Sequence, residues 1–124
     1  MTLKDAANQV RKVLPTQYCG AVIVAAGSAS RMGGIDKVMA PLGGEPMILR
    51  TVRAFEDCEA VKEIVIVTRK DLMGPIMELC SGFTKIRSAV QGGSSRQESV
   101  KLGLLAFSKE VRLAAVHDGA RPLV

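Results

Sequence analysis

The sequence has no tryptophan, one tyrosine and three phenylalanines, so its hydrophobic core has to be built from aliphatic side chains. Aromatic residues interleaved with Lys and Arg, on which single-stranded nucleic acids stack, are missing. No apolar run approaches the roughly 20 residues that span a bilayer. The N-terminus is amphipathic and mixed in charge, which is not typical of a secretory signal. These absences argue against a nucleic-acid partner and against a membrane partner.

Cysteine and histidine are also scarce. The cysteines Cys19, Cys58 and Cys80 are odd in number and widely spaced, with no C-x-x-C pair for a metal or a redox centre. This pattern predicts free thiols in a reducing compartment, the cytoplasm. His117 is the only histidine, and a lone histidine is more typical of a packed, hydrogen-bonded side chain than of a catalytic base.

The overall composition is that of an ordinary soluble domain. The 124 residues are 48% apolar and 23% charged, which suits one domain with a modest core. A formal charge of +5 favours anionic ligands, although no run of like charges suggests a nucleic-acid-binding tail.

Helical and strand patterns alternate along the chain, which predicts an α/β protein with a mostly parallel sheet. We expect strands over residues 21–26, 64–68, 86–90 and 113–116, and helices over residues 2–14, 46–57, 71–81 and 96–107. The first helix belongs to an N-terminal extension, residues 1–17, that packs on the chain or across a dimer. Residues 18–124 form the domain proper.

Two finer expectations concern helix packing. Proline breaks helix interiors, so Gly74-Pro75 should lie at or before the start of the third helix. Along the fourth helix, the spacing of Val100, Leu104 and Phe107 places these side chains toward the sheet.

A glycine-rich loop follows the first buried strand. The run 21–26 ends in Gly27-Ser28-Ala29-Ser30-Arg31-Met32-Gly33-Gly34. Backbone N–H groups at such a strand end bind anions, and Arg31 and Lys37 supply positive charge for the phosphates of a nucleotide. The spacing fits neither a P-loop nor a dinucleotide fingerprint. An ordinary strand-to-helix turn, with Lys37 as a surface lysine, remains the alternative.

A second glycine loop, Gln91 to Ser99, precedes the fourth helix, and Ser95 with Glu98 matches a capping box. Free N–H groups at this helix start favour anions and polar ligand edges, while a plain helix cap is the alternative. Asp118 follows the fourth strand, and its carboxylate suits Mg²⁺ shared with substrate phosphates. Arg121 could either pair near Asp118 or clamp a phosphate.

Four segments carry a resemblance that goes beyond spacing. They are residues 25–33 (AAGSASRMG), 42–49 (LGGEPMIL), 92–100 (GGSSRQESV) and 117–122 (HDGARP). In this order they resemble the 2-C-methyl-D-erythritol 4-phosphate cytidylyltransferases, a family of the sugar nucleotidyltransferase superfamily in the non-mevalonate isoprenoid pathway. The resemblance implies a three-layer, Rossmann-like nucleotidyltransferase fold, incomplete in this chain, and a divalent cation, Mg²⁺, as cofactor.

The resemblance also implies roles for named residues. Arg31 and Lys37 would be catalytic, and Asp118 would hold the metal. CTP would contact the first loop and the second loop through Ala25, Ala26, Gly27, Ser28, Gly92, Gly93, Ser94 and Ser99. The family often has an acidic residue at position 94, and it usually has Pro and Gln where Asp36 and Val38 stand here.

Three interpretations stay open at this point. The implied activity is cytidylyl transfer from CTP to 2-C-methyl-D-erythritol 4-phosphate, in a protein that is a homodimer when complete. A polyol-phosphate cytidylyltransferase of the ribitol type would share every motif seen here, because acceptor contacts in such enzymes come from the half that follows. An inactive nucleotide-binding fragment is the third reading, favoured by the departures at Asp36 and Val38.

Overall fold

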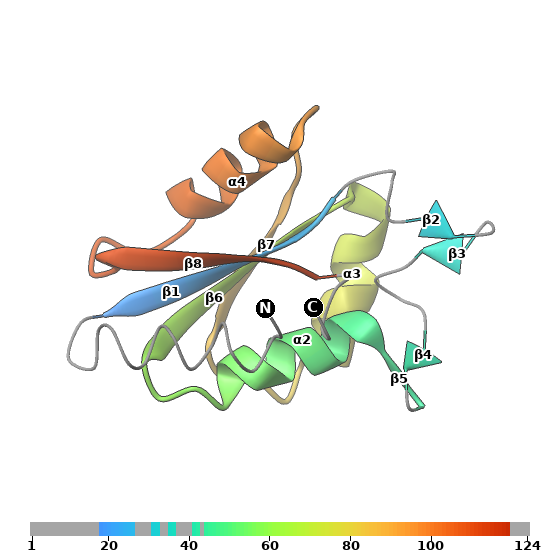
Figure 1. Ribbon diagram of the computed structural model, residues 1–124, viewed down its shortest axis with the longest axis horizontal. Coiled ribbons are helices and arrows are strands. Elements are labelled where there is room, and N and C mark those ends of the chain that lie inside the picture. Colours follow the sequence, from blue (N-terminus) through green and yellow to red (C-terminus); the bar gives the residue numbers. More distant parts are fainter. Residues whose placement is uncertain (1–17, 27–30, 33–34, 37–40, 43, 120–124) are drawn as a thin grey trace.

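The computed structural model describes residues 18–26, 31–32, 35–36, 41–42 and 44–119, the three short pairs by their backbone (Figure 1). Its centre is a parallel sheet of four strands in the order β7–β6–β1–β8. These strands are β1 (Cys19–Ala25), β6 (Val61–Thr68), β7 (Ile86–Gln91) and β8 (Leu113–Asp118). The α/β fold with a parallel sheet is therefore confirmed.

Helices cover both faces of this sheet. In Figure 1, α2 (Met47–Glu56) and α3 (Lys70–Leu79) lie on one face, and α4 (Arg96–Leu105) lies on the other. Two small antiparallel pairs, β2 (Arg31–Met32) with β3 (Ile35–Asp36) and β4 (Pro41–Leu42) with β5 (Glu45–Pro46), stand between β1 and α2 in the chain. The predicted helix 2–14 lies outside the described residues.

β1 runs through the middle of the core, and all seven of its residues are buried. Val22 and Val24 face α4 together with Val65 and Val67 of β6. The alternate residues of β1 face the other helices, in a cluster with Ile48, Val52, Phe55 and Ile76. A continuous aliphatic run is what a strand buried on both faces requires, so the sequence pattern and the packing agree.

α4 approaches the sheet through small residues, which corrects one expectation. A β-carbon on Gly103 would lie 2.7 Å from Val22 Cγ1 and 2.8 Å from Val67 Cγ2, so the helix backbone rests directly on the two valines. Val100 and Phe107 pack against the same cluster as expected, but Leu104 is 44% exposed. The expectation for Leu104 was wrong because Gly103 occupies the inward position and turns the next residue outward.

α3 corrects a second expectation, because Pro75 lies inside the helix. The residue before a proline is normally excluded from helical conformation by contact between its β-carbon and the proline ring. That residue here is Gly74, which has no β-carbon to make this contact, so the helix continues through Pro75. Buried Ile76 and Cys80 then anchor the second half of the helix in the core.

The amino-terminal end of the sheet is closed around a buried carboxylate. Glu63 of β6 is 6% exposed and accepts hydrogen bonds from the backbone N–H of Ser108, at 3.0 Å, and from the Ser108 hydroxyl. Arg87 Nε stands 3.8 Å from the same carboxylate. Burial alone would raise the pKa of Glu63, but the bonds from Ser108 and Tyr18 and the charge of Arg87 outweigh it, so its pKa is lowered.

Cys19, Cys58 and Cys80 are buried and form no disulfide bond among the described residues, in agreement with the sequence-based expectation. Burial raises the pKa of Cys80 to about 11, which keeps that thiol protonated and unreactive. Among the residues that the structure describes, no helix has the length and apolar character needed to cross a bilayer.

Candidate active site

The four strands of the sheet end at one edge. Ala25 of β1 pairs with Thr68 of β6, Thr68 pairs with Gln91 of β7, and Val24 pairs with Asp118 of β8. The chain order of the strands reverses between β1 and β8, since α4 carries the chain from β7 across to the far side of β1. Open α/β sheets bind ligands at the carboxyl edge beside such a reversal.

The second glycine loop packs on the end of β1. The N–H of Gly92 donates to the carbonyl of Thr68 at 2.9 Å, which continues the strand pairing by one residue. A β-carbon on Gly92 would lie 2.3 Å from that of Ala26 and 2.9 Å from Ser99 Oγ. The hydroxyl of Thr68 in turn donates to the carbonyl of Ala25 at 3.2 Å. Ala25, Ala26, Gly92 and Ser99 are therefore brought together, as predicted.

The rest of this loop is held by side chains of α4. Ser99 is 2% exposed, and its hydroxyl accepts the N–H of Gly93 at 3.0 Å. Ser95 caps the helix, because its hydroxyl accepts the N–H of Glu98 at 3.1 Å. The hydroxyl of Ser94 donates to Glu98 Oε2 at 3.1 Å. The expected cap at Ser95 is thus confirmed, and each of the four predicted loop residues takes part in a hydrogen bond that holds the loop in place.

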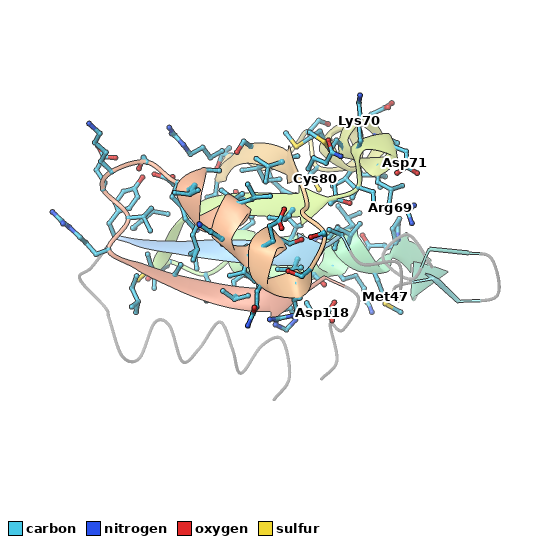
Figure 2. All side chains as sticks on the ribbon, turned by 90° about the horizontal axis from the view of Figure 1, so that it is seen from above. Met47, Arg69, Lys70, Asp71, Cys80 and Asp118 are labelled. Atoms are coloured by element: carbon cyan, nitrogen blue, oxygen red, sulfur yellow. The ribbon has the colours of Figure 1, made fainter. Side chains whose placement is uncertain are left out.

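Asp118 ends β8 at the same edge, on the strand beside β1 (Figure 2). The turn after it is fixed from two sides. The N–H of Gly119 donates to the carbonyl of Val24 at 2.9 Å, and the hydroxyl of buried Thr51 on α2 lies 3.3 Å from the carbonyl of Gly119. Figure 2 shows Asp118 and Met47, the first residue of α2, at this end of the molecule.

Asp118 fits Mg²⁺ only as one ligand among several. Its carboxylate is the kind of oxygen donor that Mg²⁺ takes. Within the described ranges, no cluster of three or more His, Cys, Asp or Glu side chains could hold a metal ion. A single carboxylate suits Mg²⁺, which is bound in proteins through one or two carboxylates and takes its other ligands from water and substrate phosphates.

The first glycine loop is only partly described. Arg31 lies in β2, with its backbone paired opposite Asp36 of β3. Figure 1 places this small pair on the side of the molecule where β1 and β6 end. Gly27, Ser28, Lys37 and Arg121 lie outside the described residues. His117 packs edge-on against Phe55, with 5.7 Å between ring centres, which agrees with a packed histidine.

Two charged residues at this edge had no assigned role in the sequence-based reading. Arg69 follows Thr68 at the end of β6 (Figure 2). Its guanidinium donates two hydrogen bonds to the carboxylate of Asp71, Nε to Oδ1 and Nη2 to Oδ2, both at 3.2 Å. Glu98 was read only as half of a capping box. The signal that could have singled them out is position, because Arg69 comes directly after the end of β6, and Glu98 lies in the first turn of the helix that follows β7.

Comparison with known proteins supports the family resemblance seen in the four sequence segments. The sequence profile of the 2-C-methyl-D-erythritol 4-phosphate cytidylyltransferase family matches residues 19–124. This chain belongs to that family. A cytidylyltransferase of this name from Symbiobacterium thermophilum is 45% identical over 104 residues, which are 83% of this chain and 43% of the relative. One from Chlorobaculum parvum is 37% identical over 116 residues, with 84% of this chain and 47% of the relative covered.

Solved structures agree with the family assignment. The crystal structure of 4-diphosphocytidyl-2C-methyl-D-erythritol synthase from Anaerococcus prevotii superposes with a TM-score of 0.75 at 30% identity, covering 90% of this chain and 47% of that one. A nucleotidyl transferase from Methanothermobacter, at 24% identity and a TM-score of 0.58, shares the fold; 82% of this chain and 50% of that one are covered. The chain spans about half the length of the cytidylyltransferases it matches.

Proposed function

We propose that this chain is the CTP-binding part of an enzyme that transfers a cytidylyl group from CTP to 2-C-methyl-D-erythritol 4-phosphate. The observation that carries the proposal is the contact between the loop at Gly92 and the end of β1 at Ala26, next to the strand that ends at Asp118. It brings the base-binding and phosphate-binding candidates to one edge of the sheet in a member of this family.

The chemistry needs positioning and neutralisation of charge more than it needs a base. A phosphate oxygen of the acceptor forms a bond to the α-phosphorus of CTP, the bond from that phosphorus to the bridging oxygen breaks, and pyrophosphate leaves. The attacking oxygen is already anionic, so no general base has to remove a proton. Arg31 can donate two parallel hydrogen bonds to phosphate oxygens, while Lys37 acts as a point charge.

Roles for the other candidates follow from where each loop begins. The backbone N–H groups of residues 25–28 would face the phosphates, as at other strand ends of open sheets. Gly92, Gly93, Ser94 and Ser99 would contact the cytosine and the ribose. Ser99 supports this role because its hydroxyl, once it has accepted the N–H of Gly93, still has a hydrogen to donate.

We also propose Mg²⁺ as the cofactor, with Asp118 among its ligands. When bound, the cation neutralises phosphate charge at the reacting phosphorus. The resemblance further suggests a homodimer for the full-length protein. The three cysteines form no disulfide bond among the described residues, and we propose that the compartment is the cytoplasm.

The test is binding of nucleotides to the chain itself. Calorimetric titration with CTP, UTP, ATP and GTP, each with and without Mg²⁺, should show tightest binding of CTP and a gain from Mg²⁺. No binding of CTP in either condition would contradict the proposal. An enzyme of full family length that carries this half would then be assayed for pyrophosphate release with methylerythritol phosphate and with ribitol phosphate, which separates the two acceptor classes.

A further inference from the structure

The carboxylate of Glu98 lies over the tip of the second glycine loop. A β-carbon on Gly93 would stand 2.3 Å from Glu98 Cγ and 2.4 Å from Glu98 Oε1, so the Glu98 side chain fills the space where residue 93 has no side chain of its own. The other carboxylate oxygen, Oε2, accepts the hydroxyl of Ser94 at 3.1 Å. Both oxygens of Glu98 are therefore directed at the loop.

This orientation differs from that of an ordinary capping box. In a capping box the glutamate at the third helical position turns back to the N–H of the capping residue. Here Ser95 does cap the N–H of Glu98, but the Glu98 carboxylate bonds to Ser94, one residue before the cap. The helix start is therefore stabilised by Ser95, while the Glu98 side chain remains exposed and places a negative charge beside Gly93.

We propose that Glu98 determines base specificity by accepting a hydrogen bond from the exocyclic 4-amino group of cytosine. This inference rests on the proposed function, in which Gly92, Gly93, Ser94 and Ser99 surround the base. An ionised carboxylate only accepts hydrogen bonds, and each of its oxygens accepts more than one. Ser94 occupies one position on Oε2, so both oxygens keep capacity for a ligand.

The same geometry gives position 94 a role. A serine there cannot itself supply a negative charge to the base, but its hydroxyl holds the carboxylate that does. The acidic group of the loop then comes from α4, one turn further along the chain. Ser94 is in this respect a positioning residue, and Glu98 is the residue that touches the base.

The chemistry of the two pyrimidines makes this contact selective. Cytosine presents an N–H donor at position 4, where uracil presents a carbonyl oxygen. A carboxylate attracts the first and repels the second, so the same residue favours CTP and rejects UTP. Glutamine has the shape of glutamate but can turn its amide to donate to a carbonyl, so Glu98→Gln should lose the preference while keeping the fold.

The experiment compares three ligands on three forms of the chain. The dissociation constants of CTP, UTP and the triphosphate of the cytidine analogue that lacks the 4-amino group are measured calorimetrically with Mg²⁺. The forms are the wild type, Glu98→Gln, and Glu78→Gln as a control that removes an exposed helical carboxylate from α3. Melting temperatures of all three establish that each is folded.

In the wild type and in Glu78→Gln, CTP should bind about tenfold or more tightly than either UTP or the analogue. In Glu98→Gln, the UTP-to-CTP and analogue-to-CTP ratios of dissociation constants should both fall close to one. The cause would be mainly weaker binding of CTP and tighter binding of UTP. A pure effect on loop stability would weaken all three ligands alike and leave the ratios unchanged, which would overturn the inference and leave the proposed function standing. A wild-type chain that binds none of the three would overturn both.

Discussion

Gly92 and Ala26 are in direct contact, since a β-carbon on Gly92 would lie only 2.3 Å from the β-carbon of Ala26. The residue after β1 and the residue after β7 therefore meet only because one of them is glycine. Ser99 Oγ would lie 2.9 Å from the same β-carbon, so the start of α4 takes part in this contact. The distance between the two halves of the candidate CTP site is set at this point.

Gly92→Ala should push the loop away from β1. Overpacking of this kind typically costs about 1–3 kcal/mol, and we expect a loss in that range together with weaker CTP binding. Urea unfolding and calorimetry measure the two effects. Gly82→Ala is the matched control, because nothing lies within 4 Å of its β-carbon position. Equal stability of the two variants would show that the loop moves freely. The contact between Gly92 and Ala26 would then not fix the distance between the two halves of the candidate site.

Arg31→Ala and Lys37→Ala should weaken CTP binding and leave the fold intact. Both residues are candidates for contact with the triphosphate, and Arg31 stands in the small β2–β3 pair, outside the four-stranded sheet. In an enzyme of full family length that carries this half, turnover should fall roughly 10²-fold or more for either variant. Lys62→Ala, which removes an exposed cation from β6, serves as the control for net charge. Wild-type turnover in the Arg31 or the Lys37 variant would refute the catalytic role of that residue.

Stability should fall in mild acid because of Glu63. Its pKa is lowered in the folded state, so its contribution to the free energy of unfolding is fully present above the unfolded-state pKa, about 4.3. That contribution is lost as the pH falls through the lower, folded-state pKa. Urea unfolding between pH 7 and pH 3 should show the loss in the wild type and a flatter profile in Glu63→Gln.

Glu63→Gln should also be less stable at pH 7, by about 1–3 kcal/mol, because it replaces charge-assisted bonds at a buried site. Glu59→Gln, at an exposed turn, is the control for loss of one negative charge. A profile for Glu63→Gln as steep as that of the wild type would assign the acid sensitivity to other carboxylates. Glu56, whose pKa is lowered by hydrogen bonds from Lys85 and Thr84 that outweigh its burial, is the next candidate.

The sheet could be predicted from the sequence because its central strands have a clear apolar pattern. β1 and the central part of β6 are short apolar runs rich in β-branched residues, a pattern that favours a strand buried on both faces. The loops that follow strands then had to share one edge of a parallel sheet. For this reason the sequence alone predicts that Ala26, Gly92 and Asp118 lie at the same edge.

The inward face of α4 and the orientation of Glu98 could not be predicted in the same way. Periodicity counts apolar side chains, so it selected Leu104 and overlooked Gly103, whose importance is the absence of a side chain. The S-x-x-E pattern predicted the cap correctly, but the direction of the Glu98 carboxylate depends on the space beside Gly93. Both features depend on other residues packing closely against the backbone of a glycine, Gly103 in one case and Gly93 in the other. Such contacts leave little trace in the hydrophobicity or spacing of the sequence.

Thr51 offers a test of how Asp118 is positioned. The hydroxyl of Thr51 lies 3.3 Å from the carbonyl of Gly119, the residue after Asp118, and 3.2 Å from the carbonyl of Met47 on its own helix. Thr51→Val keeps the β-branched shape and removes the hydroxyl. Loss of such a buried bond costs about 1–3 kcal/mol and frees the turn to move. We expect the gain in CTP affinity from Mg²⁺ to shrink, while Mg²⁺-free binding stays unchanged.

Thr51→Ser separates this effect from packing, because serine keeps the hydroxyl and loses only a methyl group. The serine variant should retain the response of CTP binding to Mg²⁺, even though its melting temperature falls slightly. If the valine variant responded to Mg²⁺ as the wild type does, the turn at Gly119 would not be what holds Asp118 in place. If both variants lost the response equally, packing of the Thr51 methyl group against the core, and not the hydrogen bond, would position the carboxylate.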